Sequence, residues 1–350
     1  MENNIILKKR QIELDFLRIL SMLAVVIVHT CGMKTHDLPY SDPNWKILTF
    51  IAALMTWQIP CFVMISGRFF LDPERTVTIK RMIKAIVRLC IAFVVWDLIY
   101  QMYYIMSGTY SNLNWKGIVL QAIEGPYHFW YIYMMIGVYL LIPFLRKFTE
   151  NKTLMEVFII LFVVFEFLTN YGPVLPIIGT TISNVLGYAS FHFALGYTGY
   201  FVAGYYLYKY PISKHLERIL YILGIIFLFG MSGLRSFTSI NDLIGFNITS
   251  YLMPNVAIES FAIYTFFVKR VSKRNFKPCV KHVIEKVSNF SSGIYYIHAL
   301  SLEIIGLFGI SPIILSPFIM VPTIALMATI ISGIVVWLIR KISGLGMKIT

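Results

Sequence analysis

The sequence predicts an all-α, polytopic integral membrane protein. Of its 350 residues, 58% are hydrophobic and only 13% are charged, and the mean hydropathy is +0.73. Apolar runs of about 18 residues or more, the length with which an α-helix spans the hydrocarbon core, recur along the chain. These runs do not alternate in hydrophobicity as the strands of a membrane barrel do, so helices are favoured.

Ten apolar runs give about ten expected transmembrane helices. They lie near residues 14–31, 47–71, 83–107, 127–146, 154–171, 192–209, 217–234, 249–268, 290–309 and 313–340. The sixth run is rich in Gly, Tyr and His and is the least typical. We expect residues 1–350 to form a single transmembrane domain with no appended soluble domain.

The distribution of Lys and Arg predicts the orientation of these helices. If the N-terminus is cytoplasmic, 25 of the 30 basic residues fall in cytoplasmic segments and four in outer loops, while Arg18 lies inside the first span. The positive-inside rule therefore favours an N-in and C-in topology, in a multi-pass protein of the plasma or inner membrane. Insertion and contact with an anionic lipid bilayer account for most of the net charge of +13, so no nucleic-acid partner is expected.

The first span, LDFLRILSMLAVVIVHTC, contains two ionisable residues, Arg18 and His29. Eleven residues at about 100° each place both side chains on nearly the same helix face, roughly 16 Å apart along the axis. Arg18 then lies near one membrane surface and His29 near the other. Ionisable residues inside a span are costly and typical of functional sites. Alternatively, Arg18 extends to the headgroups and His29 sits at the interface.

Further histidines fall in the middle or outer part of the expected membrane. His128 opens the fourth span in GPYHFWYIY beside Trp130, His192 opens the sixth span, and His298 lies within the ninth. Histidine can act as a general base or a nucleophile near neutral pH, but it can also rest at an interface beside aromatic residues. No two of these histidines have the i, i+4 spacing of zinc ligands, so no metal site is expected.

A basic cluster lies at the cytoplasmic start of the third span. In IKRMIKAIVRL, Arg81, Lys84 and Arg88 share one helical face, an arrangement suited to binding phosphate groups. The alternative interpretation is ordinary positive-inside anchoring.

The second span contains features of helix packing. Pro60 predicts a kink, and the span ends in MISGRFF. Ser66 and Gly67 have nearly the depth of Arg18, and so small a pair permits the close approach of a helix or of a ligand.

Four segments resemble motifs of the membrane-bound acyltransferase family 3, in the same order. LDFLRILSMLAVVIVHT resembles its Arg–ten residues–His motif, and IPCFVMISGRFF resembles its P-x-F-F-x-x-SG second helix. YHFWYIYMMIGVYLLIPFL resembles its H-x-W-F-L…Y-L-L-x-P fourth helix, and SSGIYYIHAL is similar to its late Y-L-x-H helix. The resemblance covers most of the chain, from residue 14 to about residue 300.

The resemblance implies transfer of an acyl group, with acetyl the first candidate, from cytoplasmic acyl-CoA to a hydroxyl of a cell-envelope glycan or lipid-linked saccharide. The Arg and His of the family correspond to Arg18 and His29. The basic pair of the third helix corresponds to Arg81 and Lys84, where Lys replaces the second Arg and lacks its bidentate geometry.

The resulting hypothesis gives each candidate residue a role. His29 is the general base or the acyl carrier, and Arg18 stands at the mouth of the cavity that holds the donor. The candidate contacts of acyl-CoA are Arg81, Lys84, Arg88 and Ser66, and those of the acceptor are His128, Trp130, Tyr295 and His298.

Two other classes of function remain open. The intramembrane acids Asp97, Glu166, Glu259 and Glu303 could form the ion path of a secondary transporter or exporter, although the two halves of the chain show no paired broken helices. The chain could also be a membrane module that supplies another enzyme. A homo-oligomer is compatible with each hypothesis.

Overall fold

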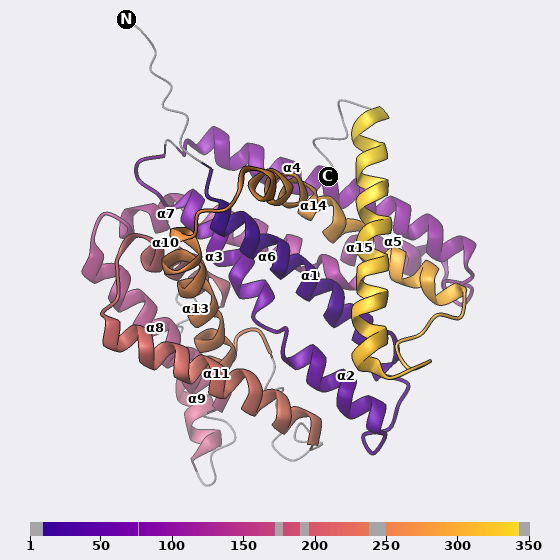
Figure 1. The fold of residues 1–350 in the computed structure, drawn as a ribbon, viewed down its shortest axis with the longest axis horizontal. Coiled ribbons are helices and arrows are strands. Elements are labelled where there is room, and N and C mark those ends of the chain that lie inside the picture. The colour runs from indigo at the N-terminus through magenta and orange to yellow at the C-terminus, as the bar shows by residue number, and fades with distance from the viewer. Residues whose placement is uncertain (1–9, 76, 172–177, 190–195, 238–249, 343–350) are drawn as a thin grey trace, which may run out of the picture.

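The computed structural model describes residues 10–75, 77–171, 178–189, 196–237 and 250–342, and all its elements in these ranges are helices (Figure 1). The predicted all-α class is therefore confirmed. In chain order the elements are α1 (Ile12–Thr35), α2 (Pro43–Ala53), α3 (Gln58–Phe70), α4 (Ile79–Met106), α5 (Trp115–Glu124), η1 (Tyr127–Phe129), α6 (Trp130–Leu140), α7 (Ile142–Phe148), α8 (Lys152–Tyr171), α9 (Gly179–Ala189), α10 (Tyr197–Lys209), α11 (Lys214–Phe237), α13 (Pro254–Lys269), η4 (Val271–Lys273), α14 (Pro278–Leu307) and α15 (Pro317–Ile342).

Each of the ten expected spans coincides with a helix or a pair of helices. Within the described residues, five helices are long and apolar enough to cross a membrane, or six if the bent pair α6–α7 is one span. Helices α10 and α13 have only 13 and 16 residues, fewer than a full crossing needs. The count of ten spans and the N-in orientation therefore stay predictions.

Two short helices, α5 and α9, were not expected from the hydropathy pattern. With 10 and 11 residues, both are much shorter than a membrane span, so they give no long apolar run in the sequence. The start of α5 is capped by Asn114, whose side chain accepts from the Gly117 N–H at 2.9 Å, and the helix ends at Gly125, which has a φ of +73°. These are ordinary N-cap and C-cap signals, and they are readable in the sequence.

Helix α1 occupies the centre of the molecule (Figure 1), where it packs against α2, α3, α13, α14 and α15. Its apolar side chains Leu14, Leu17, Met22 and Val26 are buried. Since α1 is covered on several sides, Arg18 and His29 face other helices rather than open lipid, which makes α1 a suitable element on which to build a site.

The small residues of the second span serve helix packing. A Cβ atom added to Gly67 would lie 1.8 Å from the carbonyl oxygen of Phe201, and one added to Gly204 would lie 2.1 Å from that of Met64. Helices α3 and α10 can therefore approach this closely only because glycine stands at both positions. The close approach expected at Gly67 is confirmed.

The proline in the second span accompanies an interruption of its helix. Residues 54–57 form turns between α2 and α3, directly before Pro60, which lies in the first turn of α3, where its missing N–H costs no helical hydrogen bond. Together α2 and α3 still form one apolar span, Pro43–Phe70. Between α6 and α7 the chain bends by 57°, just before Pro143.

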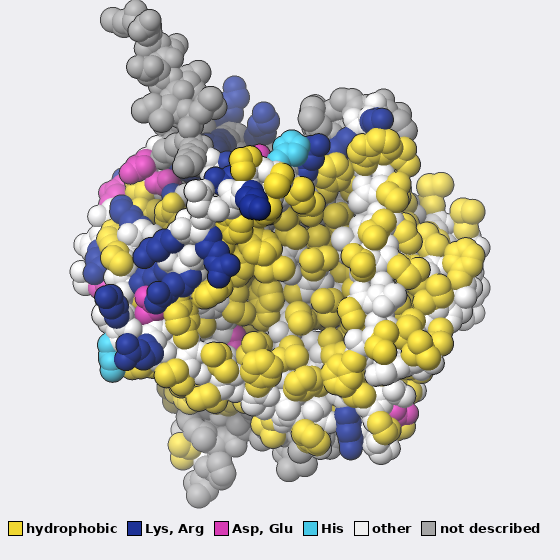
Figure 2. Space-filling view, viewed as in Figure 1, with side chains coloured by type: hydrophobic (Ala, Val, Ile, Leu, Met, Phe, Trp, Pro, Cys, Tyr) yellow, Lys and Arg dark blue, Asp and Glu magenta, His cyan; other side chains and the backbone are white. Residues whose placement is uncertain are grey.

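The surface divides into an apolar part and a basic part. Figure 2 shows hydrophobic side chains over α15 and the neighbouring lower surface, while Lys and Arg gather on the upper and left part of the view, around the start of α1, the α13–α14 connection and the start of α11. Exposed residues of α15 such as Ile319, Leu326, Ile330 and Trp337 are the kind that face lipid.

Candidate active site

Three histidines from distant parts of the chain form one cluster. His29 lies on α1, His128 on η1 and His298 on α14. The ring centroids of His29 and His298 are 4.9 Å apart, those of His128 and His298 are 5.0 Å apart, and those of His29 and His128 are 6.1 Å apart. We call these three residues the histidine cluster. His192, also noted in the sequence, lies outside the described residues.

Hydrogen bonds within the cluster fix the tautomers of two histidines. The Nδ1 atom of His298 lies 2.6 Å from the carbonyl oxygen of Tyr295. A carbonyl can only accept, so this nitrogen carries the proton, and Nε2 of neutral His298 must be an acceptor. The Nδ1 atom of His29 lies 2.6 Å from that Nε2 and is therefore the donor. The proton of neutral His29 is then on Nδ1, and its Nε2 keeps a free lone pair.

The cluster has a rigid aromatic wall. Tyr100 of α4 is fully buried, donates its hydroxyl proton to the carbonyl oxygen of Tyr296 at 3.0 Å, and accepts from the Leu300 N–H at 3.0 Å. The Tyr295 hydroxyl donates to the carbonyl oxygen of His128. These bonds connect α4 and η1 to the turn of α14 that carries His298, so its ring is held from several sides.

On one side of the histidine cluster lies a cavity of about 680 Å³, which we call the outer cavity because it follows the expected outer half of α1. His29, His36, Tyr127 and Glu303 supply its polar groups. Glu303 accepts a hydrogen bond from the Tyr104 hydroxyl at 3.2 Å. The remaining lining is mostly apolar, so the cavity combines a few polar groups with a hydrophobic wall, as small-molecule sites do.

On the other side lies a cavity of about 230 Å³, which we call the inner cavity. Its lining includes Arg18, Ser66, Tyr131, Tyr139 and Tyr295. Tyr295 also belongs to the wall of the histidine cluster, where its ring is 5.9 Å from that of His298. The cluster thus lies next to both cavities, and Arg18 and His29 mark the inner and outer ends of one stripe of α1.

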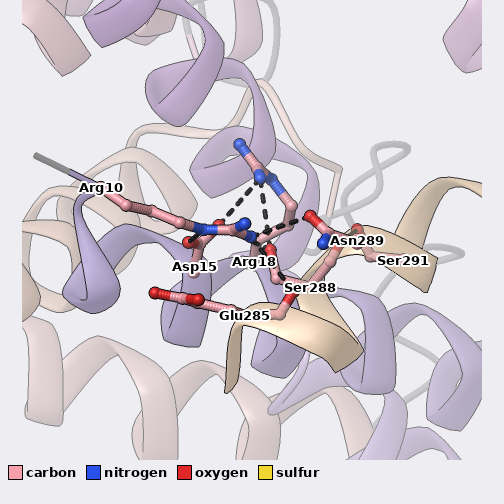
Figure 3. A network of polar contacts seen from close by, with 7 residues as sticks. All are labelled: Arg10, Asp15, Arg18, Glu285, Ser288, Asn289 and Ser291. Carbon is pink, nitrogen blue, oxygen red and sulfur yellow. Dashed lines mark hydrogen bonds and ion pairs between the residues drawn. The ribbon is translucent and has the colours of Figure 1, made fainter. Parts of the chain in front are cut away.

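Arg18 is held by an acidic partner that the sequence analysis missed. Its Nη1 donates to Asp15 Oδ1 at 3.1 Å and to Ser288 Oγ at 3.3 Å, while Ser288 donates to the same Asp15 oxygen at 2.7 Å (Figure 3). Arg10 binds the other oxygen of Asp15. The available signal was the i, i+3 spacing of Asp15 and Arg18, which places opposite charges on one face of a helix.

The basic residues expected to bind the donor do not line the inner or outer cavity. Arg81 and Lys84 are exposed near the start of α4 and are not among the residues that line the inner or outer cavity. Arg88 is exposed as well and does not line the inner cavity either, but it precedes Leu89, which does, and it interacts electrostatically with Tyr139 and Tyr296 of that lining. Of the three basic residues, Arg88 therefore comes nearest to the inner cavity along α4.

Of the four residues expected to contact the acyl acceptor, three lie together and one lies elsewhere. His128, Tyr295 and His298 come together in or beside the histidine cluster. Trp130 instead stacks on Tyr251, with ring centroids 5.7 Å apart and planes 20° apart, and is not among the residues that line the outer cavity. Trp130 follows His128 by two residues, so its indole points to a different part of the helix bundle.

A family model described as an acyltransferase domain matches residues 11–339. The chain belongs to acyltransferase family 3. No curated protein and no solved structure matches the chain. The matched range contains Arg18, the histidine cluster and the residues of both cavities, so the whole site lies within the family's own domain. With its long apolar helices, the assignment indicates a transferase of a membrane.

Proposed function

We propose that this acyltransferase moves an acyl group, with acetyl the first candidate, from cytoplasmic acyl-CoA to a hydroxyl of a cell-envelope glycan or lipid-linked saccharide. The observation that carries the proposal is the 2.6 Å contact between His29 Nδ1 and His298 Nε2. It leaves His29 Nε2 unprotonated beside the outer cavity, which is the state that a general base or a nucleophile requires.

The inner cavity suits the thioester arm of the donor. Its lining offers the hydroxyls of Ser66, Tyr131 and Tyr139 and the guanidinium of Arg18 among apolar side chains. The arm of acyl-CoA is an extended chain with two amide groups, so scattered hydroxyl partners in an otherwise apolar passage match its chemistry. An arm in this cavity would direct its thioester toward Tyr295 and the histidine cluster.

In the direct mechanism, the acceptor oxygen attacks the thioester carbonyl carbon while His29 Nε2 takes its proton. The new C–O bond forms, the C–S bond breaks, and the CoA thiolate receives the proton from His29. During this step His29 is an imidazolium whose Nδ1–H still donates to His298 Nε2, which spreads the positive charge over two rings.

In the two-step mechanism, His29 Nε2 attacks the thioester carbonyl carbon first. The C–N bond forms, the C–S bond breaks, CoA leaves as a thiolate that takes a proton from solvent, and His29 becomes an acyl-imidazolium whose Nδ1–H still donates to His298. The acceptor oxygen then attacks the acyl carbon, the C–O bond forms, the C–N bond breaks, and the hydroxyl proton passes through the released His29 Nε2 to solvent. Both mechanisms need the same free lone pair on Nε2. They differ in whether CoA is released before an acceptor is present.

The outer cavity suits the acceptor. Glu303 can accept a hydrogen bond from a saccharide hydroxyl, and Tyr127, whose ring lies 5.1 Å from that of His29, offers an aromatic face beside the reacting group. A cavity of about 680 Å³ has the size of a site for one or a few sugar rings.

The arrangement of the acids does not favour the ion path of a transporter. Among the described residues, each carboxylate has its own hydrogen-bond partners and none bonds directly to another: Gln101 for Asp97, Asn170 and Gly196 for Glu166, Asn255 for Glu259, and Tyr104 for Glu303. Transport nevertheless serves as the alternative outcome of the test.

The test uses purified protein in nanodiscs with radiolabelled acetyl-CoA and an extract of envelope glycans. We expect label in the glycan and a matching release of CoA, both lost in His29→Gln and kept in His282→Gln, a control at an exposed histidine of α14. CoA release before acceptor is added would select the two-step mechanism. No label transfer by the wild-type protein, together with substrate counterflow in liposomes without CoA, would reject the enzyme in favour of a transporter.

A further inference from the structure

A third cavity, of about 470 Å³, lies where α1 begins and the α13–α14 connection passes it. Arg10, Lys273, Arg274 and Lys281 line it, against a single acid, Glu13. We call it the basic cavity. Figure 2 shows that Lys and Arg gather on this part of the surface. Arg10 is paired with Asp15, but the other three cations outnumber Glu13, so a ligand that brings several negative charges would be stabilised there.

The basic cavity and the inner cavity share a polar wall. Arg10 lines the first and Arg18 lines the second, and the two guanidinium groups bind opposite oxygens of the Asp15 carboxylate (Figure 3). Arg10 also donates to Asn289 Oδ1 at 2.9 Å, which fixes it against α14. A single elongated ligand could therefore place its charged end in the basic cavity and pass Asp15 into the inner cavity.

We propose that the basic cavity binds the phosphorylated nucleotide end of the acyl-CoA donor. This inference rests on the proposed function, because it assigns a place to one part of the same donor. The nucleotide carries a diphosphate and a separate 3′-phosphate, which match a site lined by several cations. Arg274 can bind phosphate oxygens with two N–H groups at once, whereas Lys273 and Lys281 act as point charges. Arg10, whose Nε and Nη2 donate to Asp15, Asn289 and the Glu285 carbonyl oxygen, holds the wall of the cavity.

The basic cavity also has a partner for the adenine ring. Phe276 lines it, and a phenyl ring or an arginine plane next to phosphate-binding groups is the usual platform for a nucleobase. By contrast, Arg81 and Lys84 are exposed near the start of α4 and do not line this cavity. The basic cavity thus combines a concave surface, positive charge and an aromatic side chain in one place.

The phosphate of an anionic lipid has the same chemistry and is the competing source of a ligand. The two sources differ in the 3′-phosphate, which only the nucleotide carries. They also differ in dependence on the bilayer, because a lipid ligand must come from the membrane itself.

The experiment measures the binding of CoA and of 3′-dephospho-CoA by calorimetry, with the full chain in zwitterionic nanodiscs. The variant is Lys273→Ala with Arg274→Ala, and the matched control is Lys277→Ala, an exposed lysine of the same connection outside the cavity lining. We expect the double variant to weaken CoA binding by about tenfold or more, and the control to stay within about twofold. The wild-type preference for CoA over 3′-dephospho-CoA should shrink in the double variant.

The affinity for CoA and the melting temperature distinguish three outcomes. If the wild-type protein binds CoA and the double variant binds it equally well, this inference is wrong while the proposed function stands. If anionic lipid raises the melting temperature of the wild type but not of the double variant, at equal CoA affinity, the cavity is a lipid site. If the wild-type protein binds no CoA, the proposed function itself fails. Lys281→Gln repeats the test with a single change if the double variant does not fold.

Discussion

His29 Nδ1 and His298 Nε2 lie 2.6 Å apart, although 269 residues separate them in the chain. The Tyr295 carbonyl oxygen, 2.6 Å from the other nitrogen of His298, gives this contact a direction from the backbone through His298 to His29. In serine hydrolases a carboxylate orients the catalytic histidine in the same manner. Here a neutral histidine and a carbonyl would do so, which is compatible with a buried site because no permanent charge is introduced.

The first prediction concerns His29. His29→Gln should fold and bind acyl-CoA like the wild type but lose acyl transfer by about 10²–10⁴-fold, since an amide keeps hydrogen bonding and cannot take a proton. The measurement is transfer from labelled acetyl-CoA together with a thermal-shift assay. His29→Ala should be equally inactive. If His29→Gln turns over like the wild type, His29 has a structural role only.

The second prediction concerns His298 as a positioning residue. His298→Ala should lower kcat by about 10–10²-fold with little change in the KM for acyl-CoA, because His29 loses the acceptor that fixes its tautomer. His298→Gln should recover part of the loss, since the amide oxygen can still accept from His29 Nδ1. A purely structural role predicts that activity instead follows the melting temperature in both variants.

The third prediction concerns Asp15. Asp15→Asn removes the negative charge shared by Arg10 and Arg18 and should destabilise the protein by about 1 kcal/mol, because Asp15 is buried but solvent screens its two arginine partners, which are 38% and 30% exposed. The melting temperature in nanodiscs measures this effect. The KM for acyl-CoA should also rise, because Arg18 is no longer held at the inner cavity. Lys34→Ala, which breaks only the exposed pair with Asp37, is the control and should be neutral.

The sequence predicted the helices better than their arrangement. Apolar runs are a local signal, so a helix or helix pair was found in every expected range. Which helices touch is not local: nothing in the sequence pairs α1 with α14, and that pairing alone brings His298 to His29. The stripe of Arg18 and His29 was predictable because both lie on one helix with a fixed angle per residue.

The residues of the candidate site that were missed had weaker signals. Asp15 was readable as an i, i+3 partner of Arg18, yet acids near a helix start are common and indicate no function by themselves. Ser288 and Tyr100 act through contacts between different helices. Most of the polar lining of the basic cavity comes from the start of α1 and the α13–α14 connection, which only the folding of the chain brings together.

The fourth prediction tests the close packing of α3 against α10. Gly67→Ala would place a Cβ atom 1.8 Å from the Phe201 carbonyl oxygen, and since backbone cannot rotate away, α3 and α10 must separate. We expect a loss of about 1–3 kcal/mol or more in stability, measured by thermal unfolding in nanodiscs. Gly137→Ala on α6 is the matched control, because its Cβ would meet no atom within 4 Å, and it should be neutral or slightly stabilising.

The last prediction compares Arg88 with Lys84, the two later residues of the basic cluster on α4, as contacts of the donor. Arg88 and Lys84 are both exposed and outside the cavity lining, but Arg88 precedes the lining residue Leu89 and interacts electrostatically with Tyr139 and Tyr296, whereas Lys84 lies one turn earlier. Arg88→Ala should therefore raise the KM for acyl-CoA about three- to tenfold at an almost unchanged kcat, which is the signature of lost uniform binding. Lys84→Ala should keep both parameters near the wild-type values. Steady-state kinetics with acetyl-CoA in zwitterionic nanodiscs measures both variants without competition from anionic lipid. Equal increases of KM in the two variants would mean that the whole cluster binds the donor, and unchanged KM in both would reduce Arg88 to a topology signal.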